Sequence, residues 1–112
     1  MGQTTSPVAI VIYRITGRQG LITVPDWICP ECDLTVAAVE QACGAAGIPG
    51  AAITVRPWLI RLSEAWRQGA RHPPAVLVNG RLYSQEVVPD VGELTAYLRR
   101  LAAEAASSGG RP

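Results

Sequence analysis

The feature that most constrains the fold is an apolar run near the start of the chain, at residues 8–15. The run has the sequence Val-Ala-Ile-Val-Ile-Tyr-Arg-Ile and is rich in β-branched residues. Strands buried on both faces have sequences of this kind and occur inside parallel sheets. A chain of 112 residues is long enough for one domain with a single core. We therefore expect one α/β domain with this strand at its centre.

The composition excludes several classes of function. The chain has 10 basic and 9 acidic residues, a formal net charge of +1, which gives no electrostatic basis for binding nucleic acid or an anionic membrane. It has no lysine and one histidine, which excludes Schiff-base lysines, phosphate loops with Gly-Lys and multi-histidine metal centres. Residues 1–7 lack the basic segment of a secretory signal. We expect a cytoplasmic protein without nucleic-acid or membrane partners.

The middle of the chain alternates between helical and strand patterns. Helical spacing of apolar residues covers residues 30–47, and residues 51–56 predict a short second strand. A second helix is expected at residues 57–69, with Trp58 and Trp66 on its buried stripe. The connection at residues 16–28 is longer than the usual strand-to-helix loop. Its apolar part, residues 21–24, is compatible with a local extension of the sheet, and the pattern alone leaves this open.

The last third of the chain predicts a β-hairpin followed by a helix. Asn79-Gly80 lies between two apolar runs, which is the strongest short signal for a hairpin. Asp90 and Glu93 have the spacing of a capping box at the start of the last helix. The complete order is β-α-β-α-β-β-α, a central mixed sheet of four strands flanked by three helices. We assign residues 8–105 to the domain, and residues 1–7 and 106–112 to flexible ends.

The motif Cys29-Pro30-Glu31-Cys32 lies where the chain passes from the strand region into the first helix. Free backbone N–H groups and the positive end of the helix dipole stabilise a thiolate at such a position. A thiolate is the attacking species in disulfide exchange, so this placement favours redox chemistry. Glu31 opposes the effect by its negative charge. The sequence predicts a modest lowering of the Cys29 pKa.

The motif, the element order and Pro74 directly before the third strand together resemble the thioredoxin-like superfamily. The resemblance is closest to its short thioredoxin/glutaredoxin-like small redox-active disulfide proteins, whose ending is similar to residues 74–81 and the last helix. It implies that Cys29 is the nucleophile and Cys32 the resolving thiol. It also implies that Pro74 is a cis-proline facing the two cysteines.

Residues around the motif are candidates for contacting substrate. The resemblance implies that the residue before the cis-proline pairs with an extended substrate strand. Pro73 holds this position and has no N–H group, so only its carbonyl can take part. Trp27 and Pro30 flank the cysteines and are expected to give apolar contacts.

Two functions from different classes fit these residues. The first is a protein-disulfide oxidoreductase that needs no organic cofactor, takes electrons from a separate reductase and acts as a monomer. The second is a carrier or sensor that binds Cu, Zn or Hg through the same two thiolates. His72 is a candidate modulator of the thiols, as a proton donor or as a third ligand. An inert interaction module is a third, weaker alternative, because both cysteines are present.

The third cysteine, Cys43, is expected to have a structural role. It follows Cys32 by eleven residues, which is about 16 Å along a helix. A disulfide requires Cα atoms within about 7 Å. The sequence therefore predicts that Cys43 fills space in the core.

Overall fold

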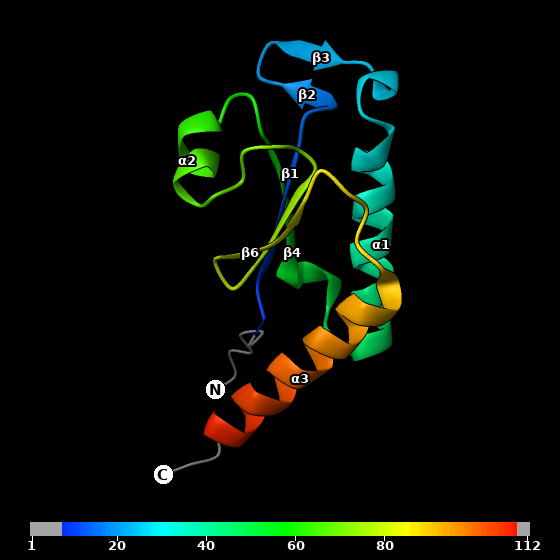
Figure 1. The fold of residues 1–112 in the computed structure, drawn as a ribbon, viewed down its shortest axis with the longest axis vertical. Coiled ribbons are helices and arrows are strands. Elements are labelled where there is room, and N and C mark those ends of the chain that lie inside the picture. Colours follow the sequence, from blue (N-terminus) through cyan, green and yellow to red (C-terminus); the bar gives the residue numbers. More distant parts are fainter. Residues whose placement is uncertain (1–7, 110–112) are drawn as a thin grey trace.

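The computed structural model describes residues 8–109 and shows an α/β fold built on a mixed four-stranded sheet (Figure 1). The strands are β1 (Ile10–Arg14), β4 (Ile53–Pro57), β5 (Ala75–Val78) and β6 (Arg81–Gln85). Their order is β4-β1-β5-β6, so the apolar run supplies a central strand, as expected. Strand β1 is parallel to β4 and antiparallel to β5, and β6 is antiparallel to β5.

Three α-helices cover the two faces of the sheet, which confirms the predicted layout. They are α1 (Pro30–Ala46), α2 (Leu62–Arg67) and α3 (Val91–Gly109). Helices α1 and α3 pack together on one face, whereas α2 lies on the other (Figure 1). Helix α1 starts at a proline, which needs no N–H partner there, and ends at Gly47, whose φ of 76° is left-handed.

Side chains of β1 alternate between two apolar clusters, one on each face of the sheet. Ile10 and Ile12 are buried among residues of α1 and α3, together with Leu94 and Leu98. Tyr13 is buried on the α2 face. Because helices cover both faces, residues 10–13 of β1 have no face in contact with water, and this explains the apolar run that Arg14 interrupts.

The Asn-Gly turn between β5 and β6 forms as the sequence predicts. Asn79 and Gly80 have φ angles of 52° and 81°, the positive values that a tight hairpin turn requires. Asn79 also binds the segment before β1: its Oδ1 accepts from the Ala9 N–H and its own N–H donates to the Ala9 carbonyl, both at 2.8 Å. The turn therefore fixes the start of the central strand.

The long connection after β1 folds into a separate small hairpin. Strands β2 (Gly17–Gln19) and β3 (Ile22–Val24) pair antiparallel outside the central sheet, and the 3₁₀ helix η1 (Asp26–Ile28) follows. Gln19 is 2% exposed and holds the hairpin in place. Its Nε2 donates to the Arg14 carbonyl and its Oε1 accepts from the Leu59 N–H, each at 3.0 Å. The apolar residues 21–24 therefore do not extend the central sheet.

The segment between β4 and β5 differs from the sequence prediction. Helix α2 begins at Leu62, because Pro57 still belongs to β4 and the Trp58 N–H donates to the Arg14 carbonyl at 2.8 Å. Residues before β4 form the 3₁₀ helix η2 (Gly50–Ala52), so the strand starts two residues later than expected. Pairing with the neighbouring strand determines where β4 and α2 begin. The spacing of apolar residues does not reveal either boundary.

Trp66 was predicted to lie in the core, and this is wrong. Its side chain is 48% exposed, and the guanidinium of Arg71 lies 5.0 Å from its ring centroid. Helix α2 is only six residues long, and the side chains that it directs to the sheet are the buried Ala65 and Glu64, which hydrogen-bonds to Tyr13. The indole is left on the outer side, in a cation–π contact.

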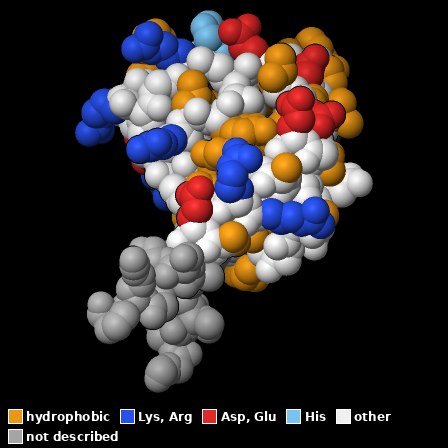
Figure 2. All heavy atoms as spheres, turned by 60° about the horizontal axis from the view of Figure 1, so that its bottom comes forward, with side chains coloured by type: hydrophobic (Ala, Val, Ile, Leu, Met, Phe, Trp, Pro, Cys, Tyr) orange, Lys and Arg blue, Asp and Glu red, His pale blue; other side chains and the backbone are white. Residues whose placement is uncertain are grey.

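The last helix continues beyond the predicted end of the domain. Residues 106–109 are helical, and the predictions for residues 1–7 and 110–112 fall outside the described residues. The predicted cap at its start is present, since Asp90 Oδ2 accepts from the Glu93 N–H at 2.8 Å. Within residues 8–109, no helix is long and apolar enough to cross a membrane. On the face shown in Figure 2, basic and acidic side chains are interspersed.

Candidate functional site

The two cysteines of the motif occupy the start of α1. Cys29 directly precedes the helix, and Cys32 lies in its first turn, with its N–H donating to the Cys29 carbonyl at 3.1 Å. Both are free thiols and contact one another. Cys32 is fully buried, and Cys29 is only 8% exposed. A nucleophilic thiol at a helix start is expected to be accessible to solvent, and for Cys29 this expectation is wrong, because neighbouring residues cover it.

Burial reverses the predicted effect on the Cys29 thiol. Burial, followed by the neighbouring Cys32 thiol, raises the pKa of Cys29 from the ordinary 9.0 to about 12. The Cys32 backbone N–H lowers this pKa and Glu31 raises it. The predicted modest lowering is wrong because desolvation of the thiolate outweighs its stabilisation at the helix start. At neutral pH this site therefore holds Cys29 as a protonated thiol.

The loop that carries Pro73 and Pro74 lies at the same end of the sheet as the cysteines. The Pro73-Pro74 peptide bond is cis, as the resemblance implies. Pro74 is buried and precedes Ala75, which pairs with Tyr13 near the C-terminal end of β1. Arg14, which follows Tyr13 in β1, forms an ion pair with Asp33 in the first turn of α1. The cis-proline loop and the motif are therefore both next to the end of the central strand.

Gln85 at the end of β6 holds this loop, a role that sequence analysis did not predict. Its Oε1 accepts from the N–H groups of Arg71 and His72, at 2.9 and 3.1 Å. The neighbouring Glu86 N–H donates to the Pro74 carbonyl at 3.0 Å. A glutamine at a strand end carries no recognisable signal, because its partners come from a loop that only the fold brings near.

His72 is exposed and does not complete a metal site. Its Nε2 lies 3.8 Å from a carboxylate oxygen of Glu86, and both side chains are about 60% exposed. Among residues 8–109, no group of three or more His, Cys, Asp and Glu side chains is placed to hold a metal ion. The hypothesis that His72 is a third ligand beside Cys29 and Cys32 is therefore wrong.

Exposed apolar side chains occur along the segment that leads into the motif. Trp27 in η1 is 77% exposed, and Pro30 is also exposed. The hairpin adds Leu21 and Ile22, which are 99% and 58% exposed. The sequence pattern does not identify Leu21 and Ile22 as candidate contact residues, because it leaves the structure of residues 16–28 open. Their apolar character, between Gly20 and Pro25, was the available signal.

An ion pair at the end of β1 anchors the first turn of α1. Arg14 Nη2 lies 2.6 Å from Asp33 Oδ1 and also donates to Thr16 Oγ1 at 3.1 Å. The arginine therefore neutralises the acid that follows Cys32 directly in the sequence. The sequence showed Arg14 only as a break in an apolar run, and its partner is nineteen residues away.

A partly buried polar network supports the face of the sheet that α2 covers. The hydroxyl of Tyr13 hydrogen-bonds to Glu64 of α2, and Arg56 Nη1 donates to the same carboxylate at 2.7 Å. Arg61 Nη1 donates to its other oxygen at 3.0 Å. These contacts, first the Tyr13 hydrogen bond and then that of Arg56, lower the pKa of Glu64 to about 2. The network attaches the short α2 to the central sheet.

Cys43 is buried as predicted. It is 1% exposed within the cluster shared by α1 and α3, and burial raises the pKa of its thiol. A protonated thiol with little access to solvent is a poor nucleophile. Cys29 is also buried and protonated, so what distinguishes Cys43 is its position near the end of α1, away from the cysteine pair at the start of the helix.

Comparisons with known proteins assign no family to this chain. No protein-family model, curated protein or solved structure matches it. The resemblance to thioredoxin-like proteins therefore rests on the cysteine motif, the order of elements and the cis-proline loop.

Proposed function

We propose that the protein is a thiol–disulfide oxidoreductase with a thioredoxin-like fold, which cycles Cys29 and Cys32 between dithiol and disulfide by exchange with protein substrates. The observation that carries the proposal is the contact between the two free thiols at the start of α1. The order β-α-β-α-β-β-α, with an added hairpin, and the cis Pro73-Pro74 bond support it.

The proposed cycle needs only the two cysteines and a substrate disulfide. The Cys29 thiol loses its proton and attacks one sulfur of the substrate as a thiolate, the substrate S–S bond breaks, and the released substrate thiolate takes up a proton. The thiol of Cys32 loses its proton and attacks the Cys29 sulfur, which breaks the mixed disulfide and releases the second substrate thiol. The substrate gains two electrons, and the Cys29–Cys32 disulfide forms. A separate reductase returns two electrons, and no organic cofactor takes part.

The buried site supports the reducing direction. A disulfide is strongly oxidising when the protein stabilises its reduced form, chiefly the thiolate. Here burial and Glu31 disfavour the Cys29 thiolate, so the reduced pair gives up electrons more readily. We therefore assign the chain to the reduction of disulfides in the cytoplasm.

Substrate contacts follow from the surroundings of the pair. Trp27, Pro30 and the hairpin residues Leu21 and Ile22 present apolar surface to a partner chain. Pro73 offers a carbonyl and no N–H to an extended strand. An apolar, extended segment around the substrate disulfide fits this arrangement.

Equilibration with glutathione redox buffers tests the proposal. Mass spectrometry should show a loss of two hydrogen atoms between Cys29 and Cys32, reversible on reduction. A Cys32→Ser variant should accumulate mixed disulfides on Cys29 when mixed with a disulfide-containing protein such as insulin. Cys43→Ala is the matched control and should cycle like the natural chain.

A soft-metal carrier is the alternative outcome of the same experiment. Two adjacent thiolates suit Cu(I), but the described residues supply no third ligand beside them. Stoichiometric metal in protein purified under reducing conditions, together with no reversible disulfide and no trapped complex, would replace the redox proposal.

A further inference from the structure

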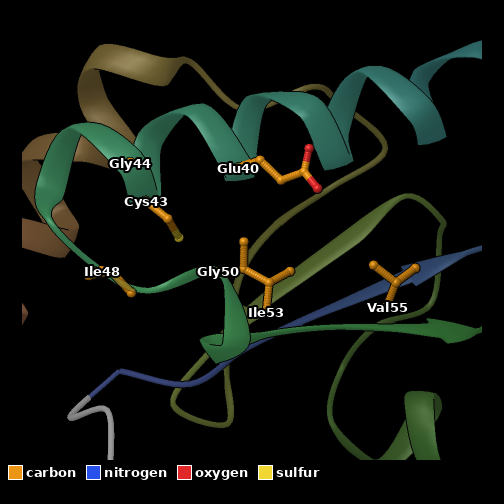
Figure 3. Close-up of a pocket in the computed structure, with 7 residues that line it drawn as sticks. All are labelled: Glu40, Cys43, Gly44, Ile48, Gly50, Ile53 and Val55. Carbon is orange, nitrogen blue, oxygen red and sulfur yellow. The ribbon is translucent and has the colours of Figure 1, made fainter.

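A two-part trough runs along the edge strand β4. The first part is a cavity of about 230 Å³ between α1 and β4, with Cys43, Ile53 and Val55 in its lining. Figure 3 shows Cys43 and Ile53 directed into this space and Glu40 on α1 beside it. The second part is a cavity of about 170 Å³, to which Val55 also contributes.

The two cavities follow one another along the strand. Ile53, Val55 and Pro57 are alternate residues of β4, and alternate residues of a strand point to the same face. Ile53 lines the first cavity, Pro57 the second, and Val55 both. Val55 is 40% exposed and forms the boundary between them. The two cavities therefore meet at an accessible apolar side chain.

The two ends of the trough differ in charge. Arg14, Arg18 and Arg56 line the second cavity, and no acidic residue does. The first cavity has one charged residue in its lining, Glu40, and is otherwise apolar or glycine. The trough is thus basic at the end of β1 and β4 and weakly acidic at the other end.

The arginines keep donors available for a ligand. Arg14 donates through Nη2 to Asp33 and Thr16 and through Nε to the Thr16 carbonyl, so its Nη1 is left for a ligand. Arg18 forms no ion pair among the described residues, and its Nε donates to the Gly20 carbonyl at 2.9 Å. Its two terminal nitrogens remain for an oxyanion, the group that arginine recognises best.

We infer that this trough binds a small amphipathic anion, with an oxyanion head at Arg14 and Arg18 and a short aliphatic tail along Val55 and Ile53 toward Cys43. Glu40 sets the direction, because it repels the head from the far end. The volume near Cys43 exceeds the roughly 150 Å³ in which an apolar cavity holds a benzene-sized molecule. Neither cavity is lined by Cys29 or Cys32, so the inference does not depend on the proposed redox function.

Isothermal titration with butyrate, hexanoate and octanoate tests the inference, with alkyl phosphates of equal chain length as the second arm. The carboxylates and the alkyl phosphates both carry an oxyanion head. The series that binds with the higher affinity identifies the natural head group. Affinity should rise about two- to fourfold for each added methylene, the effect of burying apolar surface in a partly open trough. In ¹H–¹⁵N spectra, amide shifts should concentrate at Gly17, Ile53 and Val55.

Arg18→Gln should weaken octanoate binding at least tenfold, because this side chain is exposed and contributes its charge directly to the head. Arg81→Gln, in the exposed start of β6, is the matched control and should bind like the natural chain. The inference is overturned if neither series binds at 10 mM, if affinity is independent of chain length, or if Arg18→Gln and Arg81→Gln behave alike.

Discussion

Arg14 and Asp33 join the end of the central strand to the first turn of the helix that carries the cysteine motif, with Nη2 and Oδ1 2.6 Å apart. Asp33 follows Cys32 directly, so its charge lies close to the thiols. Arg14 is 24% exposed at its side chain, and the partly buried position strengthens its effect on that charge. The ion pair therefore positions α1 and also limits the negative field at the site.

Removing Arg14 should slow the reaction of Cys29 while leaving the fold intact. In Arg14→Gln, Asp33 remains charged without a partner, and alkylation of Cys29 by iodoacetamide at pH 8 should slow by about threefold. In Asp33→Asn the pair is also lost, but no unpaired charge remains, so the rate should not fall. Each variant should lose about 1 kcal/mol of unfolding free energy or less in urea titrations. Equal slowing in both variants would contradict the electrostatic explanation.

Cys29 should titrate far above an ordinary thiol. In a Cys43→Ala background, its alkylation rate should still be increasing above pH 10, since its pKa is raised to about 12. Replacing the adjacent thiol in Cys32→Ala should move the midpoint toward lower pH, because that thiol is the second cause of the shift. Rate profiles with a midpoint near 9 in both proteins would show that burial does not control the site.

The same shift makes folding sensitive to alkali. Above pH 9 the unfolded chain loses the Cys29 proton while the folded chain keeps it up to about pH 12, so stability should fall across this window. Cys29→Ala should have a shallower decline than the natural chain between pH 9 and pH 11. Chemical denaturation at several pH values measures both slopes.

Glu64 should control how the free energy of unfolding depends on pH below pH 4.5. Hydrogen bonds from Tyr13 and Arg56 lower its pKa from 4.5 to about 2, so its contribution is complete above pH 4.5 and is lost as the pH falls toward 2. In Glu64→Gln, the unfolding free energy should be lower at pH 7 and should change less between pH 4.5 and pH 2.5. Parallel curves for the two proteins would exclude this carboxylate as a cause of acid unfolding.

Gln85 should affect exchange more than stability. In Gln85→Ala the N–H groups of Arg71 and His72 lose their acceptor, and water replaces it because both residues are exposed. Stability should change by less than about 1 kcal/mol. The looser cis-proline loop should reduce the rate of disulfide exchange with insulin by roughly three- to tenfold, since small misplacements are costly in catalysis. Gln85→Glu keeps the acceptor oxygen and should retain most of the rate.

Much of the fold was predictable because local sequence determines it. The continuous apolar run required a strand covered on both sides, and β1 lies at the centre of the sheet between two helical layers. Asn79-Gly80 supplies the backbone angles of a tight turn, and Asp90 supplies an acceptor for the last helix. Each of these depends on residues adjacent in the sequence, so their effect is independent of the remaining chain.

The candidate site was predictable in its residues and not in its environment. The motif and the helix start at Pro30 identified Cys29 and Cys32. The local rule for thiols at helix starts gave the wrong direction for the Cys29 pKa, because covering residues from elsewhere in the fold exclude water. Gln85 and Asp33 act on the site through partners at least thirteen residues away.

The sequence by itself determined the order of strands and helices, the hairpin turn and the position of the paired thiols, since all of these follow from neighbouring residues. Only the tertiary structure decided how Gln19 holds the hairpin, how Glu64 accepts hydrogen bonds from Tyr13 and Arg56, and which thiols lose contact with water. Burial and hydrogen bonding join residues that are distant in the chain. Their strength depends on the exclusion of solvent, which only the packed fold provides.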